Sequence, residues 1–273
     1  MQWSDAIGKQ HERYAATPRI VSLVPSLTEL LVDLGLGERL VGRTGFCTHP
    51  RQVVRRLPKL GGTKGFSIDK LRALQPTHVL VNIDENRRDE VAALHSFVPN
   101  VVVTHPLTVR DNLGLYRLLG GIFGGEKGVA ARAAALAADF EREWAALTAQ
   151  TATLPRQRVL YLIWRQPWLS VARDTYISHM LAAAGCDTLP TESALRYPQV
   201  DLPSLAAQAE LLLLSSEPYP FREKDLRQIN EQLPATNAAL IDGEMVSWYG
   251  SRAIRGLAYL RRWRAELAKS PRT

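Results

Sequence analysis

The stretch RIVSLVPSLTELLVDLGLGERLVGRTGFCTHP, residues 19–50, decides the fold of the first part of the chain. It opens with an apolar, partly β-branched run at 19–24, which is typical of a buried strand. A helical pattern follows, and Ser26 with Glu29 three residues later fits a capping box that would start this helix. A second apolar strand is expected at 40–42. Strand, helix and strand in this order predict a βαβ unit with parallel strands.

The same alternation continues to about residue 108. Two further apolar strands are expected at 78–81 and 101–104. The helices predicted between the strands cover residues 28–34, 68–74 and 87–97. Such an alternation predicts a parallel sheet with helices on its faces.

Strand signals stop after Pro106, and Leu, Ala, Arg and Glu dominate the next forty residues. Four glycines between 120 and 125 interrupt the pattern. As a helix, residues 126–150 would be about 38 Å long, which is enough to join two lobes. The sequence therefore predicts one long connecting helix.

The second half repeats the first in outline. A strand at 158–163 and a helix at 176–184 resemble the opening elements, and residues 205–214 repeat the pattern of 71–80. A last strand is expected at 237–241. This duplication predicts two similar lobes, and clefts at lobe boundaries commonly bind ligands.

The predicted fold class is therefore α/β: two similar lobes with parallel sheets, joined by one long backbone helix, with a ligand cleft between the lobes. The predicted segments are an N-terminal extension (1–18), an N-terminal lobe (19–108), the connecting helix (109–152) and a C-terminal lobe (153–273).

Composition excludes several classes of protein. The chain has 34 Lys and Arg against 27 Asp and Glu, a net charge of +7, and seven of these basic residues lie in residues 252–273. The apolar residues there recur at near-helical spacing, which predicts an amphipathic helix with a basic, solvated face. No groove-reading motif accompanies the charge, so no nucleic-acid partner is expected. No apolar run is long enough to span a membrane, and Cys47 and Cys186 form neither a disulfide framework nor a metal-binding pair.

The first nineteen residues are polar and charged, without the apolar region of a secretory signal. Three explanations stay open: the protein stays in the cytoplasm, a signal has been removed, or translation starts elsewhere.

Four stretches resemble the class III substrate-binding proteins of ABC importers, the helical-backbone metal receptors. Residues 19–50, followed by LPKLGGTKGFSIDKLRALQPTHVLVN at 57–82, resemble the signature of the first lobe. RYPQVDLPSLAAQAELLLL at 196–214 and SWYGSR at 247–252 match the second lobe. The cobalamin-binding branch is the most similar, because of the VGRTGF turn at 41–46 and the YPQV segment.

The resemblance implies capture of a metal chelate without chemistry on it, for delivery to an ABC transporter permease, and a periplasmic location. The expected ligand is cobalamin or a related corrinoid, with haem or a ferric siderophore as the alternative in the same fold. A cytoplasmic module that holds a corrinoid or haem without a permease is a further alternative, favoured by the missing signal. No intrinsic cofactor is expected. A monomer is expected, because no long edge strand or coiled-coil heptad is evident.

Aromatic side chains in loops after strands are the first candidates for ligand contacts, because rings give a planar macrocycle a large contact area at low entropic cost. The candidates in such positions are Phe46, Trp164, Trp168, Tyr197, Trp248 and Tyr249. Phe46 and Tyr197 match pocket aromatics of the cobalamin-binding branch. For each ring the alternative is packing inside a lobe core.

Cys47 and His49 are candidate ligands for the metal of a bound chelate, because thiolate and imidazole both bind cobalt and iron. Their spacing of two in an extended loop would direct them to opposite sides, so that only one could take an axial position. The alternative is that Cys47 is a small buried apolar residue and that His49 caps the turn before Pro50.

Asn82 and Asp84 belong to a polar run directly after a predicted strand, where they could hydrogen-bond the amide groups of a corrinoid. The alternative is that Asp84 or Asn86 caps the next helix.

An enzyme is the remaining class, and the sequence disfavours it. It contains no G-x-S-x-G, P-loop, G-x-G-x-x-G after a strand or H-E-x-x-H, and no catalytic residue is predicted. The resemblance implies docking on a permease through one acidic residue per lobe. Asp69 matches the first position, whereas Pro203 occupies the second, with Asp201 nearby.

Overall fold

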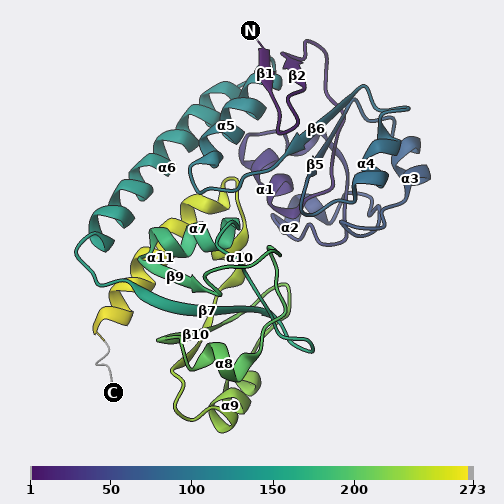
Figure 1. Ribbon diagram of the computed structural model, residues 1–273. Helices are drawn as coiled ribbons and strands as arrows, with labels where there is room; N and C mark the ends of the chain where they lie inside the picture. The colour runs from purple at the N-terminus through teal and green to yellow at the C-terminus, as the bar shows by residue number, and fades with distance from the viewer. Residues whose placement is uncertain (1, 270–273) are drawn as a thin grey trace. The chain divides into compact units, whose positions relative to one another are not determined.

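The computed structural model describes residues 2–269, and within them the chain divides into two compact units. Unit 1 contains residues 1–106, 110–140 and 249–252, and unit 2 contains residues 107–109, 141–248 and 253–273. Both are α/β, as predicted (Figure 1). No helix among the described residues has the length and apolarity that a membrane span requires.

The sheet of unit 1 has four parallel strands in the order β4-β3-β5-β6. The strands are β3 (Ile20–Ser22), β4 (Leu40–Arg43), β5 (His78–Asn82) and β6 (Asn100–Thr104). All four predicted strands are confirmed. β3 and β5 are buried along their whole length, which explains why their sequences are continuously apolar and do not alternate.

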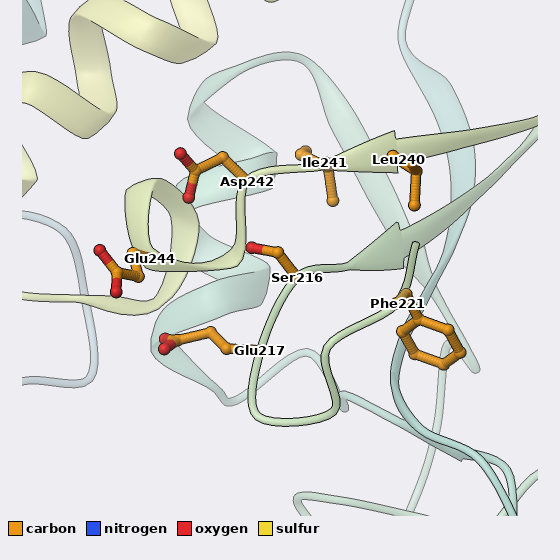
Figure 2. Close-up of a pocket in the computed structure, with 7 residues that line it drawn as sticks. All are labelled: Ser216, Glu217, Phe221, Leu240, Ile241, Asp242 and Glu244. Atoms are coloured by element: carbon orange, nitrogen blue, oxygen red, sulfur yellow. The ribbon is translucent and has the colours of Figure 1, made fainter. Parts of the chain in front are cut away.

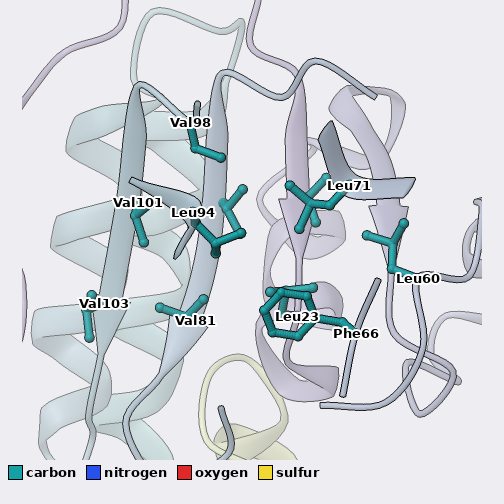
Figure 3. Packing of buried hydrophobic residues seen from close by; sticks show 11 residues of the cluster. Leu23, Leu60, Phe66, Leu71, Val81, Leu94, Val98, Val101 and Val103 are labelled. Atoms are coloured by element: carbon teal, nitrogen blue, oxygen red, sulfur yellow. The ribbon is translucent and has the colours of Figure 1, made fainter. Parts of the chain in front are cut away.

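Helices of unit 1 close the core over this sheet. They are α1 (Pro25–Asp33), α2 (Arg51–Val54), α3 (Ile68–Ala73) and α4 (Arg88–Leu94), with a 3₁₀ turn η1 (Gly37–Arg39). Leu71 of α3 and Leu94 of α4 pack with Val79, Val81 and Val101 of the strands (Figure 3). Truncating one of these buried leucines to Ala would cost about 2–5 kcal/mol.

The predicted capping box of α1 is wrong. The helix begins at Pro25 with Val24 as its N-cap, and no side chain caps it. Proline fits the first position because the amide hydrogen it lacks would have no partner there. Glu29 pairs instead with Arg252, at 2.7 Å between Oε2 and Nε.

The N-terminal extension forms a hairpin of β1 (Gln2–Ser4) and β2 (Gln10–Glu12), which the sequence did not predict. The buried carboxylate of Asp5 accepts hydrogen bonds from the amide groups of Ile7, Lys9 and Val103. The hairpin turn is thereby fixed against β6, the edge strand of the sheet.

The stretch 109–152 holds two helices, α5 (Asp111–Ile122) and α6 (Val129–Thr151), instead of one. The glycines responsible lie at the end of α5 and beyond it. A Cβ at Gly121 would collide with the ring of Trp3, so the glycine lets the hairpin pack closely on α5. At about 1.5 Å per residue, the 23 residues of α6 span about 35 Å. The boundary between the units falls inside α6, after Phe140.

Unit 2 is built on the central strand β7 (Gln157–Trp164). The parallel neighbours of β7 are β10 (Leu211–Ser215) and β9 (Cys186–Leu189), and β11 (Ala238–Ile241) extends the sheet beside β10. β8 (Leu169–Ser170) pairs antiparallel with the last residues of β7. Neither β8 nor β9 was predicted from the sequence.

The helices of unit 2 follow these strands. They are α7 (Tyr176–Ala183), α8 (Leu202–Ala206), α9 (Glu223–Gln232), α10 (Gly243–Ser247) and α11 (Arg252–Lys269), whose first residue counts with unit 1. The predicted internal repeat is confirmed, because Leu71 and Leu205 both lie on short helices that lead into buried strands. The predicted C-terminal helix is α11. Residues 270–273, which the prediction also included, lie outside the described part of the chain.

Candidate functional site

Parallel strands bring the loops that follow them to one edge of a sheet, and ligands of α/β proteins bind outside that edge. In unit 1 this carboxyl edge comprises the last residue of each strand together with residues 44–49, 83–87 and 105–106. In unit 2 it comprises the strand ends with residues 165–168, 190–200, 216–222 and 242–248. Every predicted ligand residue lies on one of these two edges, except Tyr249, which directly follows the second.

Phe46 is the exposed aromatic residue of the unit 1 edge. It follows β4 in a turn that the amide of Gly45 fixes by donating to the carbonyl of Gly61, at 2.7 Å. The ring is 63% exposed, so it does not pack in the core. An exposed ring in a fixed loop is suited to binding a flat apolar surface.

The structure separates Cys47 from His49. Cys47 is only 1% exposed, and its Sγ lies 3.1 Å from Oγ1 of Thr28 and 3.2 Å from Oγ1 of Thr44. Burial raises the pKa of the Cys47 thiol, which opposes formation of the thiolate that a metal requires. His49 is half-buried. Cys47 therefore has the properties of a buried apolar residue, and His49 is the more accessible of the two predicted metal ligands.

Asn82 ends β5 and is buried, with its polar atoms engaged inside unit 1. Its Oδ1 accepts from the backbone amide of Asp84 at 2.8 Å, and its own backbone amide donates to Oδ1 of Asn86 at 2.9 Å. The half-buried carboxylate of Asp84 lies 3.4 Å from Nε2 of His105. The alternative prediction, a cap on the next helix, is wrong, because Arg87 is the N-cap of α4.

Tyr249 is buried within unit 1. Its hydroxyl donates to Oε1 of Glu85 at 2.8 Å, and burial, reinforced by that carboxylate, raises the pKa of Tyr249 well above its usual value. The residue therefore holds the segment 249–252 on unit 1 as a neutral phenol.

Four aromatic rings form a cluster on the unit 2 edge. Trp164, the last residue of β7, is 40% exposed and meets the ring of Tyr219 edge-on at 5.6 Å. Tyr219 also contacts Phe221, and Phe221 stacks on Trp168 at 6.2 Å with nearly parallel planes. Tyr219 and Phe221 were not predicted from the sequence, because neither lies within a predicted element and their contacts with Trp164 and Trp168 join segments more than fifty residues apart.

Tyr197 lies in the loop between β9 and α8. The backbone of that loop runs beside β8, with Ser170 donating to Pro198 and Ala172 donating to Arg196. The Tyr197 ring is 41% exposed, so this edge presents a second accessible aromatic face beside that of Trp164.

Trp248 binds Glu217, which lines a pocket of about 570 Å³. The indole of Trp248 is 8% exposed, and its Nε1 donates to Oε1 of Glu217 at 2.7 Å. The pocket is lined by Ser216, Glu217, Phe221, Leu240, Ile241, Asp242 and Glu244. Figure 2 shows its three carboxylates on one side and the Phe221 ring on the other. Trp248 thus orients a carboxylate of the pocket, which the sequence did not predict.

The acidic positions expected at the permease differ between the units. Asp69 is exposed in the first turn of α3. Pro203 lies in the first turn of α8, where Asp201 is the N-cap and accepts a hydrogen bond from the amide of Ser204. Among the described residues, no group of three or more His, Cys, Asp and Glu side chains could hold a metal ion.

A family model described as "Periplasmic binding protein" matches residues 20–236. That span covers both carboxyl edges except the segment after β11. The chain belongs to the periplasmic binding protein family.

The sequence identity between this chain and individual relatives is low. A vitamin B12-binding protein of Vibrio parahaemolyticus serotype O3:K6 is 24% identical over 217 residues, which cover 80% of this chain and 77% of that protein. The periplasmic vitamin B12 binding protein BtuF of Vibrio cholerae superposes with a TM-score of 0.78 at 18% identity, over 93% of this chain and 98% of BtuF. The periplasmic heme-binding protein RhuT of Roseiflexus sp. RS-1 superposes with a TM-score of 0.75 at 22% identity, over 93% of this chain and all of RhuT. The solved structures confirm the predicted fold class.

Proposed function

We propose that this periplasmic binding protein captures a corrinoid of the cobalamin kind at the carboxyl edges of its sheets. The observation that carries the proposal is the exposure of Phe46, Trp164 and Tyr197, which all lie on these edges. Aromatic rings exposed at the carboxyl ends of parallel strands, where α/β proteins bind their ligands, offer a flat macrocycle a large contact area.

The relatives support the same ligand. The curated proteins similar to this chain over about three quarters of its length are named vitamin B12-binding proteins. Haem is the second candidate, because several solved structures of the same fold are haem-binding proteins.

The charge of the unit 2 pocket favours the corrinoid over haem. Glu217, Asp242 and Glu244 line this pocket with three carboxylates, on the side opposite the Phe221 ring (Figure 2). The two propionates of haem are anionic and would be repelled there, whereas the amide side groups of cobalamin can donate hydrogen bonds to carboxylates.

The protein acts on its ligand by capture and not by catalysis, and it delivers the ligand to an ABC permease as a monomer in the periplasm. Asp69 is the residue proposed for permease docking in unit 1. His49 is the residue proposed to reach the metal of the ligand, and Asn82, Asp84, Trp168, Trp248 and Tyr249 would shape the edges around it.

Parallel calorimetric titrations with cyanocobalamin, cobinamide and haemin test the proposal. We expect one-to-one binding of the corrinoids and weaker binding of haemin. Phe46→Ala in unit 1 and Tyr197→Ala in unit 2 should each weaken corrinoid binding about tenfold. Ile7→Ala is the matched control, because Ile7 is 58% exposed but lies outside both edges. Binding of haemin alone, or corrinoid binding indifferent to both edge variants, would refute the proposal.

A further inference from the structure

Unit 1 contains a second pocket, of about 510 Å³, beside α4. We call it the α4 pocket. Its floor is formed by Val81 and Val103 of neighbouring strands, and one wall by Val91 and Ala92 of α4. The α4 pocket shares Asn82 with the unit 1 edge, but none of the exposed aromatic rings proposed to bind the corrinoid lines it.

Two isoleucines at its rim are exposed to solvent. Ile7 is 58% exposed in the hairpin turn and Ile83 is 45% exposed directly after β5. Of the six large apolar residues that are exposed in the described chain, Ile7 alone lies outside the carboxyl edges, and Ile83 lies on the unit 1 edge. An apolar group seated in the α4 pocket would cover both isoleucines.

The rim is held in place before any ligand binds. The amide of Ala6 donates to the carbonyl of Val103 at 2.9 Å, and the Val103 amide donates to the buried Asp5 carboxylate at 3.1 Å. Ile7 is therefore fixed beside β6. A preformed pocket needs little ordering when it binds.

The charge at the pocket is positive on the α4 side. Arg88, Val91, Ala92 and His95 follow one another at helical spacing and share one face of α4. Arg88 and His95 are exposed, and neither side chain has an ion pair or a hydrogen bond in the described structure. By contrast, the nearby Glu90 carboxylate already accepts from the amide of Gly65.

We infer that the α4 pocket binds a small amphipathic anion, a carboxylate with an acyl or aryl body. The apolar body would lie on Val81 and Val103 beneath the two isoleucines, and the carboxylate would pair with the Arg88 guanidinium. The polar atoms of Asn82 and Asn86, which also line the pocket, are engaged with other groups of unit 1 and leave the interior apolar.

Calorimetric titration with decanoate, below its micelle concentration, tests this inference, with decanol as the uncharged partner. Both should bind to the wild-type protein, decanoate more tightly. Arg88→Gln should weaken decanoate binding about fivefold and leave decanol binding unchanged. Ala92→Phe should fill the pocket and abolish both. Arg87→Gln is the matched control, because Arg87 is the exposed neighbour outside the pocket and should change neither.

Three results would overturn the inference: no decanoate binding, decanoate binding that survives Ala92→Phe, or displacement of decanoate by cyanocobalamin. A fourth such result would be a dimer, detected by light scattering, that Ala92→Phe dissociates. The pocket would then be a contact between two copies of the chain. Circular dichroism of each variant verifies folding. Failure of cyanocobalamin to bind would refute the proposed function and leave the decanoate result unaffected.

Discussion

The two carboxyl edges belong to similar sheets, yet their side chains differ in what they contact. In unit 1, Asn82, Cys47 and Tyr249 are buried and hydrogen-bonded to groups of the same unit. In unit 2, the edge presents Trp164 and Tyr197 to solvent and lines a pocket with carboxylates.

This difference in contacts predicts that the buried polar groups of unit 1 contribute mainly to stability and the exposed rings of unit 2 mainly to ligand binding. A buried polar group whose partner is removed costs free energy of unfolding, because the group that stays behind is desolvated and unpaired. An exposed ring contributes little to folding and is free to contribute to binding. Substitutions on the unit 1 network should therefore lower stability, and substitutions of the unit 2 rings should lower affinity.

The largest effect is expected at the ion pair of Arg252 with Glu29, both nearly inaccessible in unit 1. Arg252→Ala leaves a buried carboxylate without its partner and should lower the free energy of unfolding by about 3–5 kcal/mol. Urea unfolding followed by circular dichroism measures the loss. Arg262→Ala, at an exposed position of the same helix, should change stability by less than about 0.5 kcal/mol. A loss below about 1 kcal/mol at Arg252 would mean that the buried ion pair with Glu29 contributes little to the stability of the fold.

The amino end of β5 adds a pH dependence to the stability of unit 1. His78 packs edge-on against Tyr14 and Phe123, and burial, with the charges of His11 and Lys9, lowers the pKa of His78 to about 4. A histidine in the unfolded chain titrates near 6.5. The contribution of neutral His78 to the free energy of unfolding is therefore complete above pH 6.5 and is lost as the pH falls to about 4. The loss in the free energy of unfolding over this range amounts to about 3 kcal/mol.

Urea unfolding at a series of pH values tests this effect of His78. His78→Gln should flatten the profile between pH 6.5 and 4 relative to the wild-type protein. His95→Gln is the control, because His95 is an exposed histidine directly after α4 in the same unit. Equal profiles for His78→Gln and the wild-type protein would contradict the prediction.

For unit 2 the prediction concerns affinity. Trp164→Ala should weaken cyanocobalamin binding by about 2 kcal/mol, roughly thirtyfold, because an accessible indole is a typical anchor. Its stability cost should stay near 1 kcal/mol, the value of one edge-on ring pair, here with Tyr219. Trp168→Ala should lower stability more than affinity, because the Trp168 ring is stacked on Phe221. Calorimetry and urea unfolding of both variants separate the two effects, and a larger affinity loss at Trp168 would contradict the comparison.

The sequence predicted the strands well because each is a short apolar run with its own turn signals, as at 78–81 and 101–104. It placed the start of α1 wrongly because Pro25 at the first helical position outweighed the Ser26–Glu29 pattern. It missed the N-terminal hairpin because β1 and β2 have only three residues each and depend on Asp5 and β6 for their position.

The candidate site shows the same limit. The sequence identified which residues follow strands, and hence the carboxyl edges. It could not show which of them would be exposed, because burial depends on partners far along the chain. Glu29 and Arg252 are 223 positions apart in the chain, and Trp164 and Tyr219, whose rings are in contact, are 55 positions apart. Exposed Phe46 and buried Cys47 are adjacent in sequence and differ only through such partners.

That adjacent pair gives the smallest expected effect. Cys47→Ala should leave the visible spectrum of bound aquocobalamin unchanged, because a buried thiol whose pKa is raised and whose sulfur faces Thr28 and Thr44 is not available to cobalt. His49→Ala is the matched variant two residues away, on the more accessible candidate. A spectral change with His49→Ala alone would assign the axial ligand to unit 1. A change with Cys47→Ala would show that the thiol becomes accessible on binding, and the assignment of Cys47 to the buried groups of unit 1 would then fail.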